Sequence, residues 1–492
     1  MKVLVSLVMM ISVAWTTFGQ KAYEINRNRR YDEISWLITH NAYNNRVDGP
    51  GGFCLGGGNQ ERSILRQLQD GVRSFMVDMY RVNGKYRLKH GSPNTCMMNA
   101  ENFNRILYNW IKDHPLDIIT LHIEAGDNFN RPDLENVFLG RQSGYRNLSS
   151  YIYNHKQFRS ASRPNGSGSD VYPTINEMLA QKKQLVIYVE KDVQSDLFQY
   201  EFSNTVQNLF RANQVDQLFN NDKFVRHRGV DHKTILTVNH FAVDSPFGTG
   251  DKNKSRSANQ SVLQKAITAW WQFGRKPSVA VDYYEMSRGR SAMSQIVDVN
   301  AINEVRGKFI LPSSPGKHIR DVKAYFAAFE NGRWQKIKDI NHQGQRSNWH
   351  LFYSIPAQQN ETRAVFFEHP SYTFSPAFIE LEKYRGNQRK TSVVNVTVRP
   401  KPGSKSLNTF DEPLAINRTE LQPAEVLNPT STAVYEYTLY SLSGRLHQKY
   451  FSSTPLRKAI IDWKQSGKYQ GLHIVIEKDV QTGKTNAHKI VL

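Results

Sequence analysis

The feature that most constrains the fold is an alternation, from about residue 31 to residue 303, of short apolar runs with amphipathic stretches of helical period. Such runs predict buried strands, and the stretches between them predict helices packed against a sheet. The pattern therefore indicates an α/β domain, expected at residues 20–308. The expected strands lie at residues 35–39, 72–78, 118–123, 185–189, 234–238 and 279–283.

Two segments rich in Pro, Ser, Gly and Lys, at residues 312–316 and 399–404, divide the rest of the chain. Between them, short runs rich in β-branched and aromatic residues predict a β-sandwich at residues 317–398. After them, similar runs predict a second small β module at residues 404–492. The expected architecture is therefore an α/β domain followed by two small all-β domains.

The N-terminus has the pattern of an export signal. Lys2 precedes thirteen apolar residues, 3–15, and small residues at Thr17 and Gly19 suit cleavage before Gln20. The apolar stretch is short for a membrane-spanning helix, so residues 1–19 are predicted to be a signal peptide and the protein to be secreted or at the cell surface. A buried N-terminal strand is the alternative.

The charge balance favours an anionic partner. The chain carries 64 Lys and Arg against 44 Asp and Glu, a net charge of +20. Together with export, this excess favours an anionic membrane surface or a phosphorylated substrate over nucleic acid. The two cysteines exclude a disulfide scaffold, and export allows Cys54 and Cys96 to pair; two separate buried thiols are the alternative.

Residues suited to acid–base and metal chemistry follow successive predicted strands. His40 and Asn41 end the first strand, Asp78 ends the second, and His90 follows a short hairpin-like segment after it. Cleavage of a phosphodiester needs one group to remove a proton and another to supply one, which two histidines provide. Carboxylate and amide oxygens, including Glu124 after the third strand, suit Ca²⁺ rather than zinc. Taken singly, each residue is more often structural, because a lone histidine in a buried strand is usually a hydrogen-bonded core residue and an Asp at a strand end usually caps a helix. Their joint placement at successive strand ends is harder to explain structurally.

The ordered set resembles the phosphatidylinositol-specific phospholipase C X-domain family, and most closely its single-X-domain branch of plants and microbes. The resemblance is carried by Ser35-Trp-Leu-Ile-Thr-His40-Asn-Ala-Tyr, by Asp70-Gly-Val-Arg-Ser-Phe-Met-Val-Asp78, by Leu88-Lys-His90-Gly and by Asp117-Ile-Ile-Thr-Leu-His-Ile-Glu124. It continues more weakly to residue 303. The resemblance implies a distorted TIM (β/α) barrel.

The resemblance also implies roles for individual residues. His40 corresponds to the general base that takes the proton from the inositol 2-hydroxyl, and His90 to the general acid that protonates the departing diacylglycerol oxygen. The expected substrates are phosphoinositide lipids or glycosyl-phosphatidylinositol (GPI) anchors, and the first product is a cyclic inositol phosphate. Asp282 is expected to orient a catalytic histidine, and Lys191 to contact substrate phosphate; a turn cap and a solvated lysine are the alternatives.

The resemblance further implies a calcium site. Asn41, Asp78 and Glu124 match the positions that hold Ca²⁺ in the metal-dependent members, so a dependence on Ca²⁺ is predicted. Met76 is a departure, because animal signalling enzymes place a second carboxylate there. By strand alternation the side chain of Met76 points the same way as that of Asp78.

The C-terminal module resembles the sorting domain that Bacteroidetes use for type IX secretion, on residues 437–445, 467–476 and 489–492. An ordinary β-sandwich appendage is the alternative. Two other functions stay open: a glycerophosphodiester phosphodiesterase, whose usual His-Arg-Gly start is absent, and a noncatalytic lipid- or glycan-binding barrel, against which the presence of both His40 and His90 argues.

Overall fold

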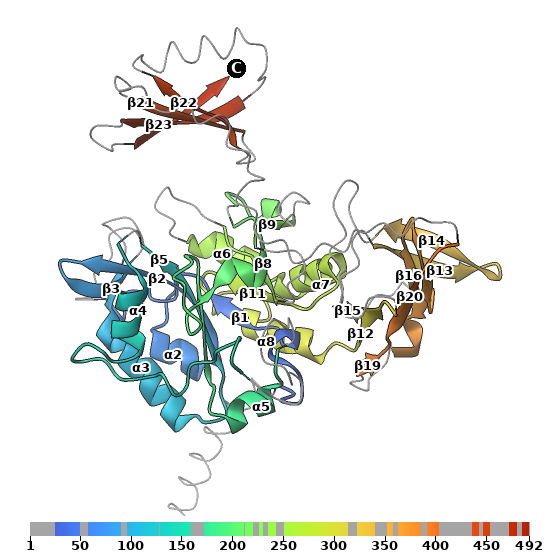
Figure 1. Ribbon diagram of the computed structural model, residues 1–492, viewed down its shortest axis with the longest axis horizontal. Helices are drawn as coiled ribbons and strands as arrows, with labels where there is room; N and C mark the ends of the chain where they lie inside the picture. Colours follow the sequence, from blue (N-terminus) through green and yellow to red (C-terminus); the bar gives the residue numbers. More distant parts are fainter. Residues whose placement is uncertain are drawn as a thin grey trace, which may run out of the picture. The chain divides into compact units, whose positions relative to one another are not determined.

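The computed structural model describes most of the first 402 residues and four strands near the C-terminus (Figure 1). The chain divides into two compact units, Met1–Phe410 and Asp411–Leu492, which are described separately. The predicted signal peptide, Cys54 and His90 lie outside the described residues. The described ranges are 25–49, 58–89, 96–126, 128–158, 172–210, 212–219, 226–229, 235–242, 250–312, 322–339, 352–357, 363–384, 391–402, 435–441, 446–452, 472–479 and 485–491.

A mainly parallel sheet forms the α/β part of the first unit. From β7 to β8 all neighbours in this sheet pair in parallel, and these two strands are joined in the chain through a 3-10 helix, Glu201–Ser203. The described strands form a half-barrel, because no pairing between β7 and β8 closes the sheet among the described residues. We call this part of the chain the barrel. Along the path the strands are β7 (Gln199–Tyr200), β6 (Leu185–Val189), β5 (Ile119–Ala125), β2 (Ser74–Val82), β1 (Leu37–Thr39), β11 (Pro277–Val281), β10 (Ile235–Asn239) and β8 (Thr205–Asn208).

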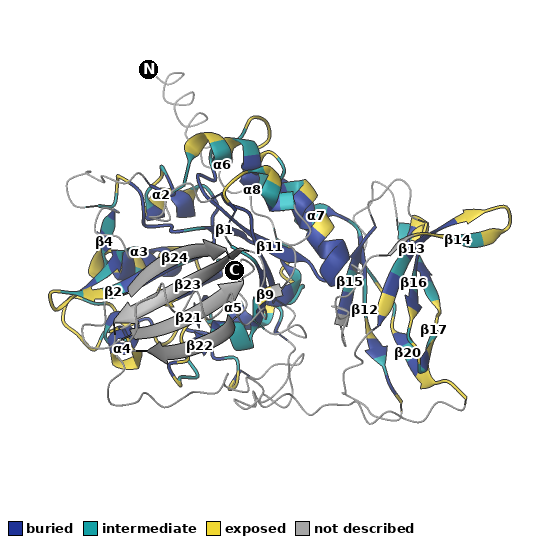
Figure 2. Cartoon of the chain, turned by 90° about the horizontal axis from the view of Figure 1, so that it is seen from above, coloured by how far each residue is buried: buried dark blue, intermediate teal, exposed yellow. Residues whose placement is uncertain are grey.

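Six of these strands coincide with the predicted ones within a few residues, because continuous apolar runs are what a sheet buried on both faces requires. Figure 2 shows the barrel strands buried and the surrounding helices half-exposed. The antiparallel strands β3 (Lys85–Lys89), β4 (Met97–Asn99) and β9 (Arg226–Gly229) extend the sheet. The helices are α2 (Ile64–Gln69), α3 (Ala100–Asp113), α4 (Arg131–Phe138), α5 (Ile175–Ala180), α6 (Lys252–Asn259), α7 (Val262–Phe273) and α8 (Ala292–Ala301).

Helix α3 illustrates how local sequence sets these elements. The Asn99 side chain caps the helix by accepting a hydrogen bond from the backbone N–H of Glu101. Phe103, Leu107 and Trp110 recur at helical spacing and are buried in the main core. The helix ends before Pro115, as the spacing predicts.

The middle region is a β-sandwich, because a five-stranded and a four-stranded sheet share one apolar core. Its first strand begins at Glu304, before the Pro/Ser/Gly segment at residues 312–316. The strands are β12 (Glu304–Ile310), β15 (Phe352–Pro356), β17 (Tyr372–Ser375), β19 (Thr391–Val393) and β20 (Val396–Pro400) in one sheet, and β13 (Lys323–Glu330), β14 (Arg333–Asp339), β16 (Ala364–Glu368) and β18 (Phe378–Glu380) in the other.

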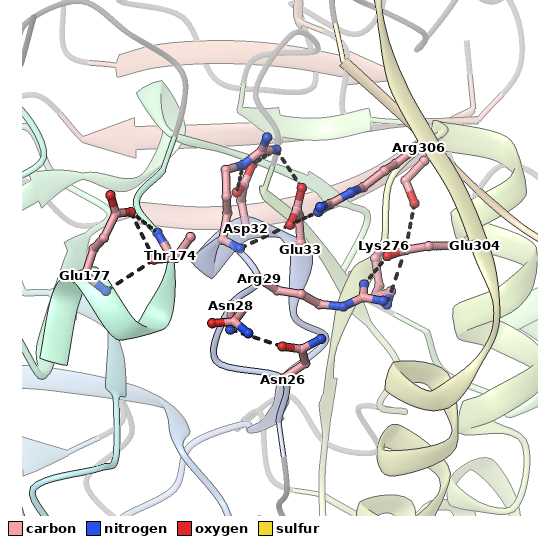
Figure 3. Close-up of polar contacts among 12 residues, drawn as sticks. Asn26, Asn28, Arg29, Asp32, Glu33, Thr174, Glu177, Lys276, Glu304 and Arg306 are labelled. Atoms are coloured by element: carbon pink, nitrogen blue, oxygen red, sulfur yellow. Dashed lines mark hydrogen bonds and ion pairs between the residues drawn. The ribbon is translucent and has the colours of Figure 1, made fainter. Parts of the chain in front are cut away.

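The sandwich is joined to the barrel through buried contacts (Figure 3). Trp271 of α7 belongs to the sandwich core, with its ring centroid 4.3 Å from that of Phe326. At the start of β12, the buried Glu304 forms ion pairs with Arg29 and Lys276, the latter at 3.5 Å. Burial alone would raise the pKa of Glu304, but these two cations hold it below its usual range. Barrel and sandwich thus share core residues.

The second unit contains one antiparallel sheet in the order β22-β21-β23-β24. The predicted strand at residues 459–462 lies outside the described residues. Among the described residues, no helix combines the length and the hydrophobicity needed to cross a membrane. The strands are β21 (Tyr435–Ser441), β22 (Leu446–Ser452), β23 (Leu472–Asp479) and β24 (Thr485–Val491).

Candidate active site

His40 and Asp282 lie together at the carboxyl ends of two neighbouring strands. Strands β1 and β11 pair in parallel, with Thr39 opposite Val281, so the residues that follow them are adjacent. His40 Nδ1 is 2.9 Å from Asp282 Oδ1. The His40 side chain is 16% exposed and that of Asp282 only 1%. A hydrogen bond from Nδ1–H to the carboxylate leaves Nε2 of His40 as the basic nitrogen, and Nε2 has no hydrogen-bond partner within the described ranges.

Three further residues hold this pair in place, two by contact and one through its neighbour. The Asn59 amide donates to Asp282 Oδ1 at 3.0 Å, and Asn44 in turn donates to Asn59 Oδ1 at 2.5 Å. Phe241 stacks on the imidazole of His40, with ring centroids 3.8 Å apart and an interplanar angle of 4°. These contacts restrict the imidazole to one orientation, as a positioned base requires.

The predicted calcium ligands lie near the same edge of the parallel sheet, although Asp78 does not end its strand, because β2 continues past it to Val82. Asp78 of β2 is directly opposite Glu124 of β5 in the parallel ladder. Asp78 is buried and accepts a hydrogen bond from the Tyr43 hydroxyl at 3.1 Å, whereas Glu124 is exposed. Asn41 follows His40 with a φ of 46°, in the left-handed region that asparagine tolerates, and donates to Asn59 Oδ1 at 3.4 Å.

Glu190 adds a third carboxylate that sequence reasoning missed, directly after β6. Burial raises its pKa to about 8, although the ion pair with Arg228, at 2.9 Å, acts in the opposite direction. The neighbouring carboxylates of Glu201, Glu124 and Asp78 contribute to the rise. The raised pKa thus reports mainly the removal of Glu190 from water, with a smaller contribution from the nearby carboxylates.

Arg228 of β9 is the cation that faces this acidic group. Its guanidinium lies 4.8 Å from the ring centroid of Phe202 and 4.6 Å from that of Phe210. It also donates to Gln207 Oε1 at 2.9 Å. Arg228 comes from a short strand between residues with no apolar periodicity, which is why pattern reasoning did not single it out.

Other predicted residues are placed as follows. Met76 packs in an apolar cluster with Ile38, Phe241 and Ala280, so an apolar contact fills the position of the second carboxylate. Lys191 is exposed and directly follows Glu190. His90 would follow β3, which ends at Lys89, but lies outside the described residues. Cys96 is buried and Cys54 lies outside the described residues, so their bridge stays a prediction.

The side chains of the predicted calcium site carry the types of ligand atom that a hard cation prefers. Asn41, Asp78 and Glu124 supply an amide and two carboxylate oxygens, the ligand types that Ca²⁺ prefers. Within the described ranges, no three His, Cys, Asp or Glu residues are already grouped closely enough to enclose a metal ion. A cation here would therefore need amide or carbonyl oxygens, or water, in addition to the two carboxylates.

A family model described as "PI-PLC X 1" matches residues 27–297, more than half of the chain. The chain belongs to the PI-PLC X domain family. The match covers β1 to β11 and therefore every residue of the site described above.

Curated relatives share this region at low identity. The PI-PLC X domain-containing protein At5g67130 of Arabidopsis thaliana is 28% identical over 173 residues, which cover 34% of this chain and 38% of the relative. PI-PLC X domain-containing protein 1 of Arthroderma benhamiae is 25% identical over 276 residues, 52% of this chain and 81% of the relative. An uncharacterized secreted protein of the same fungus is 28% identical over 170 residues, 33% of each chain. The match thus spans well under half of the first and third relatives.

Among solved structures, the phosphatidylinositol-specific phospholipase C of Listeria monocytogenes aligns with a TM-score of 0.39 at 14% identity, over 56% of this chain and 96% of that one. A pentafluoro-Phe form of the Staphylococcus aureus enzyme aligns with a TM-score of 0.39 at 12% identity, over 57% and 96%.

Proposed function

We propose that this chain is a phosphodiesterase that cleaves phosphatidylinositol-type lipids, including GPI anchors. The observation that carries the proposal is the His40–Asp282 pair at the carboxyl end of the barrel strands, with Nδ1 to Oδ1 at 2.9 Å. A buried carboxylate that fixes the imidazole tautomer and leaves Nε2 available is the arrangement of a general base. The family membership supports the same chemistry.

In the proposed reaction, Nε2 of His40 takes the proton of the inositol 2-hydroxyl while that oxygen forms a bond to phosphorus. The bond from phosphorus to the diacylglycerol oxygen breaks, and His90 donates a proton to that oxygen. The products are diacylglycerol and a cyclic inositol phosphate. Asp282 stabilises the imidazolium that forms, and Arg228, Glu190 and Lys191 supply groups for the inositol hydroxyls and the phosphate.

Calcium is part of the proposal. Asn41, Asp78 and Glu124 would hold the ion, and Tyr43 orients one carboxylate through its hydrogen bond to Asp78. The ion would supply positive charge close to the phosphate, where negative charge develops in the transition state. The position of Asp78 directly opposite Glu124 in the parallel ladder supports a cation bound between the two carboxylates.

The first prediction concerns chelation. We expect wild-type protein to release water-soluble inositol phosphate from phosphatidylinositol vesicles, and chelation of Ca²⁺ to lower this rate by about 10²-fold or more, restored by added Ca²⁺. Release is measured as soluble phosphorus after lipid extraction. If no inositol phosphate is released at any Ca²⁺ concentration, the proposed enzymatic activity is wrong. Cleavage of glycerophosphodiesters alone would favour the alternative function, a glycerophosphodiester phosphodiesterase.

A second prediction concerns Gly250, next to the catalytic pair. A Cβ at Gly250 would lie 2.7 Å from Asp282 Oδ2 and 3.0 Å from Cγ, a distance that side chains do not tolerate. Gly250→Ala should therefore displace Asp282 and lower kcat by about 10- to 100-fold with little change in KM. Gly289→Ala is the matched control, because nothing lies within 4 Å of its Cβ position. Equal kcat in both variants contradicts the positioning of Asp282.

The context of the enzyme is proposed as well. Residues 1–19 are proposed to act as a signal peptide, with support from the secreted fungal relative, and residues 404–492 as a type IX secretion sorting module. The net charge of +20 supports peripheral binding to an anionic membrane. A Cys54–Cys96 bridge is proposed to join the two sides of the stretch that carries Asp78 and His90, because the two cysteines flank it in the sequence.

A further inference from the structure

Five aromatic residues occupy the outer face of the β14-β13-β16-β18 sheet. Neighbours at alternate positions, such as Phe326 and Phe367, enter the sandwich core, so strand alternation places the five on the opposite face. The cross-strand registers agree, since aromatic residues stand opposite one another on adjacent strands. We call this set the aromatic face: Tyr325, Phe329, Trp334, Phe366 and Phe378.

The rings of the aromatic face pack on one another. Tyr325 and Phe366 stack with centroids 5.2 Å apart and an interplanar angle of 11°, and Phe366 and Phe378 stack at 4.6 Å and 19°. Trp334 lies 5.2 Å from both Phe329 and Phe378. Tyr325, Phe366 and Phe378 therefore use their ring faces on one another. A sugar needs a free ring face to stack on, so the stack of these three rings disfavours a glycan ligand.

The aromatic face is open to solvent. None of its five residues is buried, and Phe329 is 45% exposed. The β13–β14 hairpin projects from the sandwich (Figures 1 and 2). Its two strands are joined by a turn formed by Asn331 and Gly332, both with positive φ. Ile337 of the same hairpin is 48% exposed. A contiguous apolar surface of this kind marks an interaction site in a water-soluble fold.

The side chains around the rings indicate the class of partner. On the aromatic face, the cations Lys323 and Lys336 offset the carboxylates Glu368 and Glu380, and Lys336 Nζ lies 4.8 Å from the ring centroid of Tyr325. The face is therefore near neutral and suited to apolar contact, while the chain as a whole carries +20 and is attracted to an anionic surface. Aromatic rings flanked by lysines are the residues that favour the headgroup level of a bilayer.

We propose that the aromatic face is a docking surface for a phospholipid membrane. The inference rests on the proposed function, because a lipid substrate brings the enzyme to a bilayer. The hairpin tip enters the interfacial zone with Phe329 and Trp334 leading, and the basic charge of the chain draws the protein to anionic lipid. Docking through the sandwich is separate from chemistry at His40.

The experiment measures binding of the full chain to sedimented vesicles of phosphatidylcholine, with and without phosphatidylglycerol. Wild type should bind both, more tightly when phosphatidylglycerol is present and at low salt. Phe329→Ser and the double variant Phe329→Ser/Trp334→Ser should bind at least about tenfold more weakly. Val393→Ser, on the other sheet and 62% exposed in the wild type, is the matched control and should bind as wild type does.

Hydrolysis of a monomeric short-chain phosphatidylinositol separates docking from catalysis, because it needs no vesicle. The double variant should keep this activity and lose cleavage of vesicle lipid. Wild type that binds vesicles through this face yet hydrolyses neither substrate would support docking and reject the proposed function. Equal vesicle binding by wild type and Phe329→Ser would overturn the proposal. So would a dimer dissociated by Phe329→Ser, because a second copy would then cover the face.

Discussion

Replacement of His40 by alanine is expected to lower the rate of inositol phosphate release by about 10³-fold or more, because general base catalysis contributes typically 10²–10⁴-fold. KM should change little, because the His40 imidazole takes up a proton in the chemical step and contributes little to binding of the lipid. The same measurement on Asp282→Asn should show a smaller loss, about 10- to 10³-fold, because the imidazole remains but its tautomer is no longer fixed by a carboxylate.

Two controls separate catalysis from folding in this experiment. Added imidazole should restore part of the activity of His40→Ala, because the cavity left by the ring admits a free base, and it should not restore Asp282→Asn. Thermal melting of both variants should stay within a few degrees of the wild type. Full activity in His40→Ala would show that His40 is not the general base, whatever the result for Asp282→Asn.

The part of the site that is formed by residues at the ends of apolar runs could be predicted from the sequence. His40, Asp78 and Glu124 end apolar runs, and parallel strands bring their carboxyl ends to one edge, so the runs alone predict that these residues are neighbours. Asp282 follows the last such run, and its carboxylate lies against the His40 imidazole. Its role in orienting a catalytic base stays a prediction.

The other half of the site could not be predicted in this way. Asn59 and Arg228 come from segments without periodicity, and their roles depend on hydrogen bonds that only the folded chain reveals. Glu190 was missed in favour of Lys191, because a lysine next to a strand end suggests phosphate binding, whereas the carboxylate beside it is the residue that pairs with Arg228. For Glu190 the sequence does hold a signal, because it is a charged residue directly after the apolar run of β6.

The sequence also predicts a sandwich after the barrel but not the way the two are joined. The pattern of α7 identifies an apolar helix face, yet it does not reveal that Trp270 and Trp271 contact different partners. Trp270 belongs to the barrel core and donates to the Ser354 carbonyl of β15, whereas Trp271 belongs to the sandwich core. Long-range contacts of this kind have no local signature in the chain.

Because of this shared core, Trp271→Ala should be among the most destabilising substitutions in the protein. The side chain is 4% exposed and packs edge-on against Phe326, so its removal leaves a cavity and should lower the free energy of unfolding by about 3–5 kcal/mol. Glu304→Ala should cost a similar amount, about 3–5 kcal/mol, because Lys276 would be left buried, and Arg29 half-buried, without this carboxylate.

Chemical denaturation followed by tryptophan fluorescence and by circular dichroism measures both effects. Since Trp271 and Glu304 link the two cores, the barrel and the sandwich should unfold in one transition, and each variant should shift that whole transition rather than split it. Leu116→Ala, at a side chain 54% exposed, is the control and should shift it by less than about 0.5 kcal/mol. A sandwich that melts separately while the barrel keeps its wild-type midpoint would contradict the coupling. The sandwich would then be an appendage, and the aromatic face would be tethered to the barrel rather than held rigidly against it.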